Sequence, residues 1–289
     1  MAELIIRTVT QGLVYAPLAY GIFITYRILD FPDLTVDGSF PLGAAVSALL
    51  ITKGVNPYLT LPAAMACGAL AGLCTGLIHV KLKVRDLLAG LITMTALFSV
   101  NLQIGGSNLS IIGEDTIFSL APLGDMGTVC RKLTVSLIIA LAVKIILDFY
   151  FETKSGYLLR STGDNEKVVI SMGIDSGNVK ILGLVIANSL VALCGAVVCQ
   201  EQRAFSSTMG QGQMIFGLAA VIIGTAMFRR VGFVKGTTMA VMGSCVYKIC
   251  IQLALSMGLP ANMLKLITAL LFLVVLTASM KRGQTHDRA

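Results

Sequence analysis

Three aspartates lie close together in an otherwise apolar chain and could bind a cation. Asp30, Asp33 and Asp37 fall in the stretch RILDFPDLTVDGSFPLG, where prolines and a glycine separate two apolar halves. Proline and glycine interrupt helices, and irregular backbone at membrane depth persists only where protein or water satisfies its polar groups. Carboxylates in such a break could bind an ammonium group, line a wet cavity or hold the loop through its amides. An ordinary interfacial turn is the alternative.

Other ionisable residues lie inside apolar segments. Lys144 and Asp148 are four residues apart, so they can pair on one helix face and offset part of the cost of burial, whereas Lys248 has no partner nearby in the sequence. Ionisable residues at membrane depth are candidates for function, and snorkelling towards the interface is the alternative for Asp148. A proton-coupled secondary transporter would use the Lys144–Asp148 pair, and this alternative stays open here.

The composition is that of a chain that crosses a membrane several times. Charged residues make up 13% of the 289 residues and hydrophobic residues 56%, and several apolar runs approach the roughly 20 residues that a spanning helix needs. The second run has only about fourteen residues, so a broken or re-entrant element is expected there. A single all-α membrane domain over residues 1–289 is expected, with about nine spans at Ile5–Leu29, Ser39–Thr52, Pro57–Val80, Leu87–Ile104, Leu133–Phe151, Val179–Cys199, Met214–Phe228, Thr237–Met257 and Met263–Met280.

Basic residues indicate which side of the membrane each loop occupies. The net charge of +7 does not gather on one soluble face and no nucleic-acid-binding module is visible, so a nucleic-acid partner is not expected. Thirteen of the 22 Lys and Arg fall in four segments that alternate with the spans, which the positive-inside rule places in the cytoplasm. A cytoplasmic C-terminus follows. The thirteen residues are Lys81, Lys83, Arg85, Lys154, Arg160, Lys167, Lys180, Arg229, Arg230, Lys235, Lys281, Arg282 and Arg288.

The remaining motifs favour packing over catalysis. Gly68, Gly72 and Gly76 form two overlapping GxxxG motifs that let another helix come close, although the sequence does not show which helix. Seven cysteines lack a CxxC pair and the two histidines are far apart, so neither a metal site nor a catalytic residue is expected. There is no GxxxxGK[ST] loop, so an ATP-driven process would need a nucleotide site on another subunit.

A polar island, LLRSTGDNEKVVISMGIDSGNVK, separates two apolar spans and predicts a short capped helix. Ser161, Thr162 or Asp164 can cap about eight residues that Gly173 ends. An isolated helix of this length is marginal, so it is expected to dock on another surface. A plain cytoplasmic loop is the alternative. The apolar side of the helix would be formed by Val168, Val169 and Met172.

The same island carries a resemblance to a known family. TKSGYLLRSTGDNEKVVISMGIDSGNVKILGLVIANSLVALCGAV resembles the cytoplasmic-loop signature of ABC importer permeases of the branched-chain amino acid and ribose type. GQGQMIFGLAAVIIGTAMFRRVGFVKGTTMAVMG is similar to a second span of that family and the turn after it. FPDLTVDGSFPLGAAV is similar to the subgroup associated with tryptophan or tyrosine uptake and lacks the His-containing turn of the branched-chain subgroup, which leaves the cargo open. The signature residues are Gly156, Leu159, Arg160, Gly163, Asn165, Met172, Gly173, Ile174 and Lys180.

The resemblance implies the permease subunit of an ATP-driven importer that moves an aromatic or branched-chain amino acid across the cytoplasmic membrane of a prokaryote. It implies a second permease copy, a dimer of ATPase subunits that binds ATP and Mg²⁺, and an external solute-binding protein, with no cofactor and no catalysis in this chain. In that family the island is a coupling helix that fits the ATPase, expected here at 164–173. Its contact residues would be Gly163, Asp164, Asn165, Glu166, Val168, Val169, Met172, Gly173 and Ile174.

The resemblance also gives the broken segment a role. A translocation path would take polar walls from the break and from the fourth span, and the expected residues are Asp33, Thr35, Asp37, Ser39, Thr93 and Asn101. A structural or scaffold membrane protein is a further alternative, which a sealed bundle without a wet cavity would favour.

Overall fold

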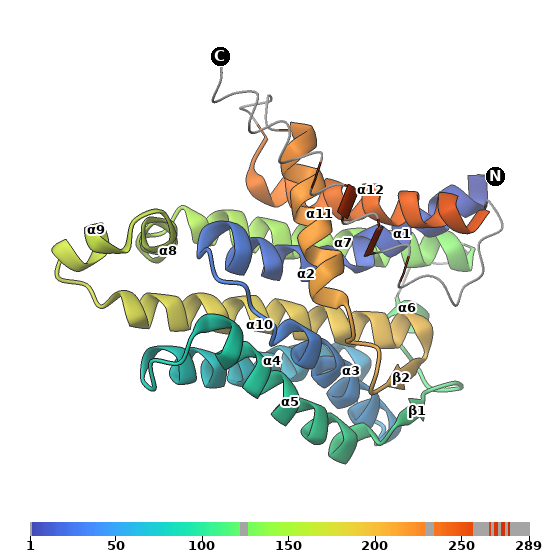
Figure 1. The fold of residues 1–289 in the computed structure, drawn as a ribbon. Coiled ribbons are helices and arrows are strands. Elements are labelled where there is room, and N and C mark those ends of the chain that lie inside the picture. Colours follow the sequence, from blue (N-terminus) through green and yellow to red (C-terminus); the bar gives the residue numbers. More distant parts are fainter. Residues whose placement is uncertain are drawn as a thin grey trace.

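The computed structural model describes residues 2–121, 127–228 and 234–256 and the single positions 266, 269, 270, 273, 274 and 277. The regular secondary structure of these residues consists of helices and one pair of short strands (Figure 1). The first elements are α1 (Ala2–Val14), α2 (Ala16–Ile22), the π-helix η1 (Phe23–Ile28), α3 (Val36–Thr52), α4 (Pro57–Val80), α5 (Asp86–Gly105), β1 (Asn108–Ser110) and α6 (Ile117–Leu120). They are followed by α7 (Thr128–Phe151), α8 (Lys154–Asp164), α9 (Glu166–Ser171), α10 (Ser176–Gln202), β2 (Ala204–Ser206), α11 (Gln213–Phe228) and α12 (Gly236–Ser256).

Five helices are long and apolar enough to cross a membrane, namely α4, α5, α7, α10 and α12. They coincide with predicted spans, and α4 has the predicted bounds. Two apolar helices, α3 and α11, are shorter, with 17 and 16 residues. The predicted span Met263–Met280 lies outside the described residues except for the single positions, so the expected number of about nine spans stays a prediction.

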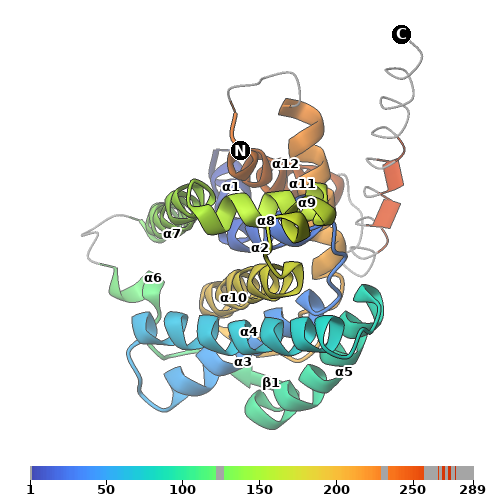
Figure 2. The same ribbon diagram turned by 90° about the vertical axis from the view of Figure 1, so that its left-hand side faces the viewer.

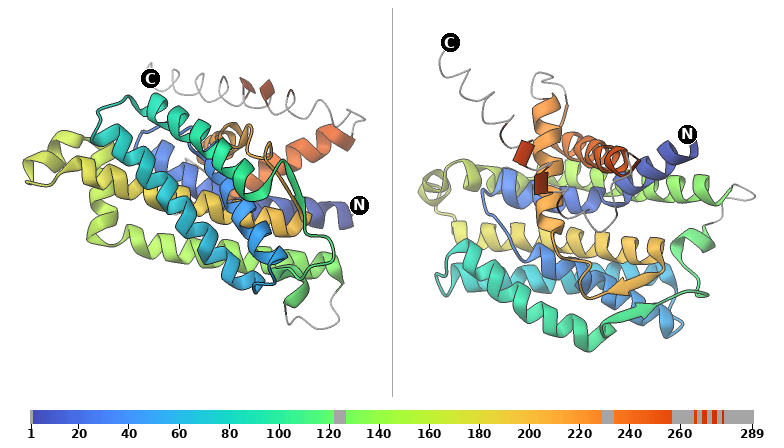
Figure 3. Two further views of the ribbon diagram at one scale, coloured as in Figure 1. Left: turned by 90° about the horizontal axis from the view of Figure 1, so that it is seen from below. Right: turned by 45° about the vertical axis from the view of Figure 1, so that its right-hand side comes forward.

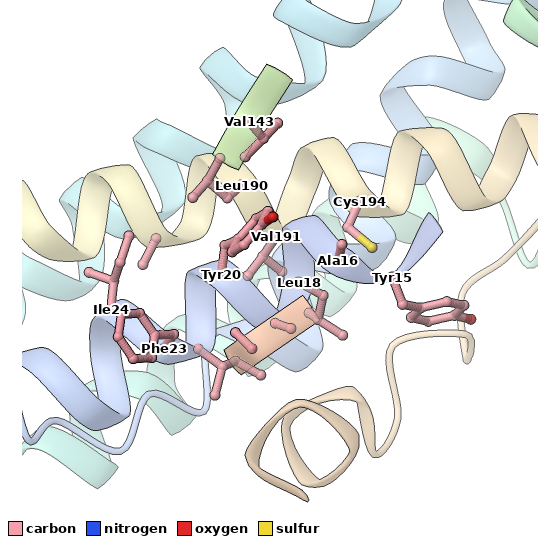
Figure 4. Close-up of a cluster of buried hydrophobic side chains, with 14 of the residues drawn as sticks. Tyr15, Ala16, Leu18, Tyr20, Phe23, Ile24, Val143, Leu190, Val191 and Cys194 are labelled. Carbon is pink, nitrogen blue, oxygen red and sulfur yellow. The ribbon is translucent and has the colours of Figure 1, made fainter. Parts of the chain in front are cut away.

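α10 is the central helix. In its most apolar stretch 72% of the residues are buried inside the chain, against 22–33% in the other four long helices. Figure 2, which looks along α10, shows α3, α4 and α5 on one side of it and α1, α2, α7 and α12 on the other. Figure 4 shows Tyr20, Leu190 and Val191 in the apolar core between α2 and α10. The remaining long helices therefore leave apolar faces free for lipid or for other subunits.

Small residues bring α4 against α10. A side chain at Gly72 would meet the Leu184 carbonyl oxygen, and one at Gly76 would lie 3.0 Å from the Ile181 side chain. Gly68 is equally close to the backbone of α10. Both GxxxG motifs therefore pack against a helix of the same chain, as close approach through small residues allows.

The predicted first span, Ile5–Leu29, is divided into three helical parts. Pro17 lies in the first turn of α2, where its ring fits a helix start but interrupts continuation from α1. η1 then closes with a bond from the Leu29 N–H to the Ile24 carbonyl at 3.0 Å. Asp30 follows in the left-handed region, with φ 51°, and the predicted break separates η1 from α3. Single π-turns of this kind occur frequently at functional sites.

α11 lies across the bundle. It crosses α10 and α12 steeply in Figure 1 and in the right panel of Figure 3. The predicted segment Met214–Phe228 forms α11, and its orientation was not predicted from the sequence. Its 16 residues at 1.5 Å each reach about 24 Å, which is less than the thickness of the bilayer core, about 30 Å.

The end of the molecule opposite α8 and α9 is held by strands and by one glutamine. β1 pairs antiparallel with β2, and Leu109 lies opposite Phe205. Gln200, at the end of α10, donates to the hydroxyls of Ser47 at 3.1 Å and Thr60 at 2.9 Å. These bonds join the ends of α3, α4 and α10.

The polar island forms two helices, α8 and α9, where one was predicted. Asn165 separates them and caps α9 by accepting from the Lys167 N–H at 3.1 Å. Gly173 ends this segment with φ 77°, as predicted, and Ile174 packs against the core. α9 is shorter than the predicted bounds 164–173, because Asp164 still belongs to α8 and the helix ends at Ser171. The final turn of α8 contains the residues predicted as caps and signature, namely Ser161, Thr162, Gly163 and Asp164.

Candidate functional site

A buried network of hydrogen bonds holds the break between η1 and α3. Asp33 accepts from the Thr35 N–H at 2.8 Å and from the Asn188 side-chain amide at 2.7 Å. Asn188, on α10, accepts in turn from the Ser39 hydroxyl at 2.5 Å. The Thr35 and Thr75 hydroxyls lie 2.7 Å apart and join the break to α4. Because all of these side chains are buried, the network satisfies polar groups that irregular backbone at membrane depth must otherwise leave unpaired.

Asp37, in the first turn of α3, fixes the start of α11. Its carboxylate accepts from the Gly212 N–H at 3.0 Å and from the Met214 N–H at 2.8 Å, and so caps α11 from a distant part of the chain. The same carboxylate lines a cavity of about 260 Å³ between α3, α5 and the turn before α11. A carboxylate that accepts two bonds can accept more, from a cation or a hydroxyl. Further lining residues are Met94, Thr95, Phe98, Asn101, Ser207 and Gln211.

Asn101 lines the same cavity and has an unpaired acceptor that is fully buried. Its amide nitrogen donates to the Gly38 carbonyl at 3.1 Å, and this bond orients the amide because a carbonyl oxygen only accepts. The other atom, Oδ1, is buried and has no hydrogen-bond partner in the described part of the chain. Leaving an acceptor unpaired in this way costs about 1–3 kcal/mol. The cavity therefore presents the Asp37 carboxylate, which suits an ammonium or a hydroxyl group, and Asn101 Oδ1 lies buried next to its lining.

The six residues predicted for the path fall into two groups. Asp37 and Asn101 line the cavity. The others are buried beside it and do not line it, because their polar atoms bond to the network or, for Thr93, to the Ala89 carbonyl of its own helix at 3.1 Å. The members of this second group are Asp33, Thr35, Ser39 and Thr93.

Two residues of the site were not predicted. Asn188 lies in an apolar span, and its bond to Asp33 joins positions 155 residues apart, which sequence spacing does not reveal. Gln211 lies between Gly210 and Gly212, and this pair of glycines before an apolar helix is the signal that marks a turn there. Gly210 contacts the Asp37 carbonyl oxygen so closely that a side chain would not fit.

Charged residues at the α8 end of α7 are paired with one another. Lys144 and Asp148 form the predicted ion pair at 2.7 Å, and Asp148 also accepts from the Thr237 hydroxyl at 2.5 Å. Lys235 bonds to Glu152 at 2.9 Å. A cavity of about 560 Å³ lies beside them, between α7, α8 and the start of α12. Mutual pairing explains how these residues are tolerated in and beside an apolar helix.

α9 exposes an apolar surface. Val168, Ile170 and Met172 have 48%, 56% and 63% of their surface exposed, although all three are large apolar side chains. Val169 is fully buried and holds α9 to the rest of the chain. The predicted apolar side is therefore divided, because Val169 faces inwards and Ile170, which was not predicted, faces outwards. An exposed apolar cluster at the polar end of a membrane protein is typical of a contact surface.

α8 joins this surface to the broken segment. Gly163 lies against the Ile28 carbonyl at the end of η1, where a side chain would not fit. Leu159 is fully buried, and both it and Leu29 contact the position of Gly183 on α10. Packed contacts of this kind transmit displacement, so a movement of α8 would act directly on the end of η1.

Glu166 ties α9 to α10 and makes the stability of this junction depend on pH. The Lys180 ammonium at 2.9 Å and the Ser176 hydroxyl at 2.8 Å lower the pKa of Glu166 below its ordinary value of 4.5. A lowered pKa stabilises the folded state above that value, and the contribution is lost as the pH falls through the folded-state pKa. At pH 7, Glu166→Gln is expected to lower the free energy of unfolding by only about 0.5 kcal/mol, because the side chain is partly exposed. Below the folded-state pKa of Glu166, the variant and the unmodified protein are expected to be equally stable. Thermal unfolding at pH 7 and at a pH below the folded-state pKa measures this, with Lys167→Gln, at an exposed position, as control. An equal difference in stability between Glu166→Gln and the unmodified protein at both pH values would contradict it.

Comparison with known proteins connects these features to transport. Residues 4–276 match the family described as branched-chain amino acid transport system, permease component. Over 273 residues the chain is 39% identical to the tyrosine transport system permease protein of Clostridioides difficile, covering 94% of this chain and 90% of that protein. It is 26% identical over 238 residues to the ribose import permease protein of Haemophilus influenzae, covering 81% and 72%.

A solved structure shares the fold. An ABC transporter described as of the metal-chelate type, in an inward-facing conformation, superposes with a TM-score of 0.52 at 17% identity, over 94% of this chain and 85% of that one. At this identity the likeness concerns the fold alone.

Proposed function

Because this chain belongs to the family of branched-chain amino acid transport permeases, we propose that it forms the path of an ATP-driven importer whose cargo is an amino acid. The chain is the permease component of an ABC transporter, a multi-pass membrane protein that does not itself hydrolyse ATP. Its relative named for tyrosine transport supports an amino acid, and an aromatic one in preference to a branched-chain one.

The observation that carries the coupling proposal is the exposed apolar face of α9. Val168, Ile170 and Met172 form a docking surface for an ATPase subunit, and buried Val169 anchors it. ATP and Mg²⁺ are bound by a dimer of such subunits, and closure of that dimer displaces α9 and α8. The contact between Gly163 and Ile28 passes this displacement to η1 and the break, so that the path opens to alternate sides.

The basic residues support an orientation for the chain. In Figure 1 the loop between α4 and α5, with Lys81, Lys83 and Arg85, lies at the same end as α8 and α9. By the positive-inside rule this end is cytoplasmic. The opposite end carries Glu114 and Asp115, both exposed, and is where a solute-binding protein docks. α1 begins at that outer end. The C-terminus lies outside the described residues, and its cytoplasmic side stays a prediction from the charges.

A second copy of the chain completes the path. The cavity at Asp37 is bordered by Thr95 and Phe98, which lie on the exposed side of α5, and Phe98 has 45% of its surface exposed. A second permease facing this side closes the cavity into a central path between two copies. Residues 1–289 act as one membrane domain in this arrangement.

The cargo's ammonium group binds at Asp37, in the cavity that Asn101 also lines. Asp37→Asn keeps the shape of the side chain but removes its charge and one of the two acceptors for the Gly212 and Met214 N–H groups, so uptake of labelled L-tyrosine by the reconstituted importer is expected to fall about tenfold or more. The measurement uses vesicles that contain the permease, its ATPase and its binding protein. Thr134→Val, which removes only a bond to the Cys130 carbonyl of the same helix, is the control. Uptake by Asp37→Asn at the rate of the unmodified protein would contradict the assignment.

The Lys144–Asp148 pair raised the alternative of a proton-coupled transporter. In the structure Asp148 also contacts Thr237 and Lys235, so the pair has a structural role in joining α7 to α12. The importer proposal also supplies a partner for the exposed apolar face of α9, whereas a proton-coupled transporter does not. Uptake that requires ATP and persists without a proton gradient supports the importer, and the reverse result would support the alternative.

A further inference from the structure

Lys248 is a membrane-embedded cation that the transport path described so far does not use. It lies in the middle of α12, and no carboxylate of the described residues is within ion-pair distance of it. Glu201, whose charge acts on Lys248, is itself bonded to Lys132 at 2.6 Å. Lys144, which also lies within an apolar helix, pairs with Asp148, so Lys144 and Lys248 differ in this respect. An ammonium group at this depth needs stabilisation from another source.

Two aromatic rings supply part of that stabilisation. The Lys248 ammonium is 3.6 Å from the centre of the Tyr15 ring and 4.8 Å from that of the Phe216 ring. Tyr15 lies at one end of the core cluster in Figure 4. The rings hold the cation in place by attraction to their negative faces, but they carry no net charge to balance it. The ammonium group is therefore left without an ion-pair partner among the described residues.

A cavity of about 480 Å³ lies beside the ammonium group, between α1, α11 and α12. This volume is within the range of small-molecule sites, which combine apolar walls with a few placed polar groups. Here the apolar walls include Phe216 and Ile251, and the polar groups besides Lys248 are the side-chain amides of Gln11, Gln211, Gln213 and Gln252. The combination of one cation, several amides and an aromatic ring suits a small organic anion with an apolar part.

This cavity adjoins the one at Asp37. Gln211 lines both cavities, and Gly212, which lines the second, donates its N–H to Asp37. The turn before α11 thus has an acceptor for an ammonium group, Asp37, on one side and the cation of Lys248 on the other. Because an α-amino acid carries its ammonium and carboxylate groups on one carbon atom, the cargo would occupy these two sites one after the other.

We propose that Lys248 binds the carboxylate of an α-amino acid cargo in the cavity between α1, α11 and α12. This inference rests on the proposed import of an amino acid and adds the residue that distinguishes such a cargo from a neutral sugar. Complementary charge placed at one position favours a charged partner and excludes one that lacks the matching group.

Direct binding to the purified permease–ATPase complex tests the role of Lys248 without selection by the binding protein. Labelled L-tyrosine is the probe, and Lys248→Met, which has similar length and no charge, is expected to lower its affinity about tenfold or more. Lys248→Arg keeps the charge and is expected to recover most of the affinity. Equal affinity for the unmodified protein and Lys248→Met, or a loss in Lys248→Arg as large as in Lys248→Met, would overturn the assignment.

Competition gives a second measurement, and its propionate arm uses only the unmodified complex and so does not depend on how a variant folds. 3-(4-Hydroxyphenyl)propionate keeps the carboxylate of tyrosine and lacks its amine, whereas tyramine keeps the amine and lacks the carboxylate. The propionate is expected to displace labelled tyrosine in the unmodified complex, and tyramine competition is expected to change less than twofold in Lys248→Met. Propionate that fails to compete would overturn the proposal for Lys248. Failure of the proposed function would be a different result, namely no ATP-dependent uptake of any amino acid by the unmodified importer.

Discussion

Met172→Glu is expected to abolish most ATP-dependent uptake by the importer while the permease still folds. Met172 has 63% of its surface exposed in this chain, so a carboxylate there is solvated when the permease is alone. In the complex the same carboxylate would be buried in an apolar contact, at a cost of about 3 kcal/mol, which weakens association with the ATPase about a hundredfold. Uptake into vesicles and the amount of ATPase that co-purifies with the permease measure the two effects.

A matched control separates docking from general damage. Ile112 is an equally apolar side chain, 79% exposed, near β1 at the other end of the chain. Ile112→Glu adds the same charge and is expected to leave the amount of bound ATPase unchanged. Val169 is unsuitable for this experiment because it is fully buried, so a charge there would disrupt folding. If Met172→Glu retained normal uptake and normal ATPase binding, α9 would not be the docking element.

Asn188→Leu is expected to lower the free energy of unfolding by about 3 kcal/mol, because it leaves Asp33 buried with one donor fewer and removes the acceptor of Ser39. Leucine has a similar volume, so the loss reports the hydrogen bonds more than the packing. Titration of the purified chain with SDS, followed by loss of helicity, measures the change.

Thr225→Val is the matched control for this network. The Thr225 hydroxyl bonds only to carbonyls of its own helix, at Val221 and Ile222, so its removal is expected to change stability by less than about 1 kcal/mol. Equal stability of Asn188→Leu and the unmodified chain would show that the break is held by something other than the Asp33–Asn188–Ser39 network.

Local patterns in the sequence predicted much of the helical architecture. The bounds of α4, the break before α3 and the Lys144–Asp148 pair depend on residues close together in the chain, where periodicity, proline and glycine, and a spacing of four decide the outcome. Glycine spacing likewise predicted the packing face of α4, although it did not identify α10 as the partner.

What the sequence did not predict depends on distant contacts. The start of α11 is fixed by Asp37, which accepts a hydrogen bond from the Gly212 N–H, 175 residues further along the chain. Several residues of the polar island are good helix caps, and their sequence does not show that Asn165 is the one that caps α9 or that Gly163 packs against η1. Asn188 was missed because an asparagine in an apolar span has no recognisable pattern until Asp33 and Ser39 are placed beside it.

The most direct test of the account is a covalent one, at the surface where α9 is proposed to dock. A photo-crosslinking amino acid placed at position 172 of the assembled importer is expected to form an adduct with the ATPase subunit, and the same group at position 112 is expected to form none. An adduct at position 172 with lipid or water alone, with the ATPase present and active in the same complex, would contradict the proposal that α9 carries motion from the ATPase into the membrane.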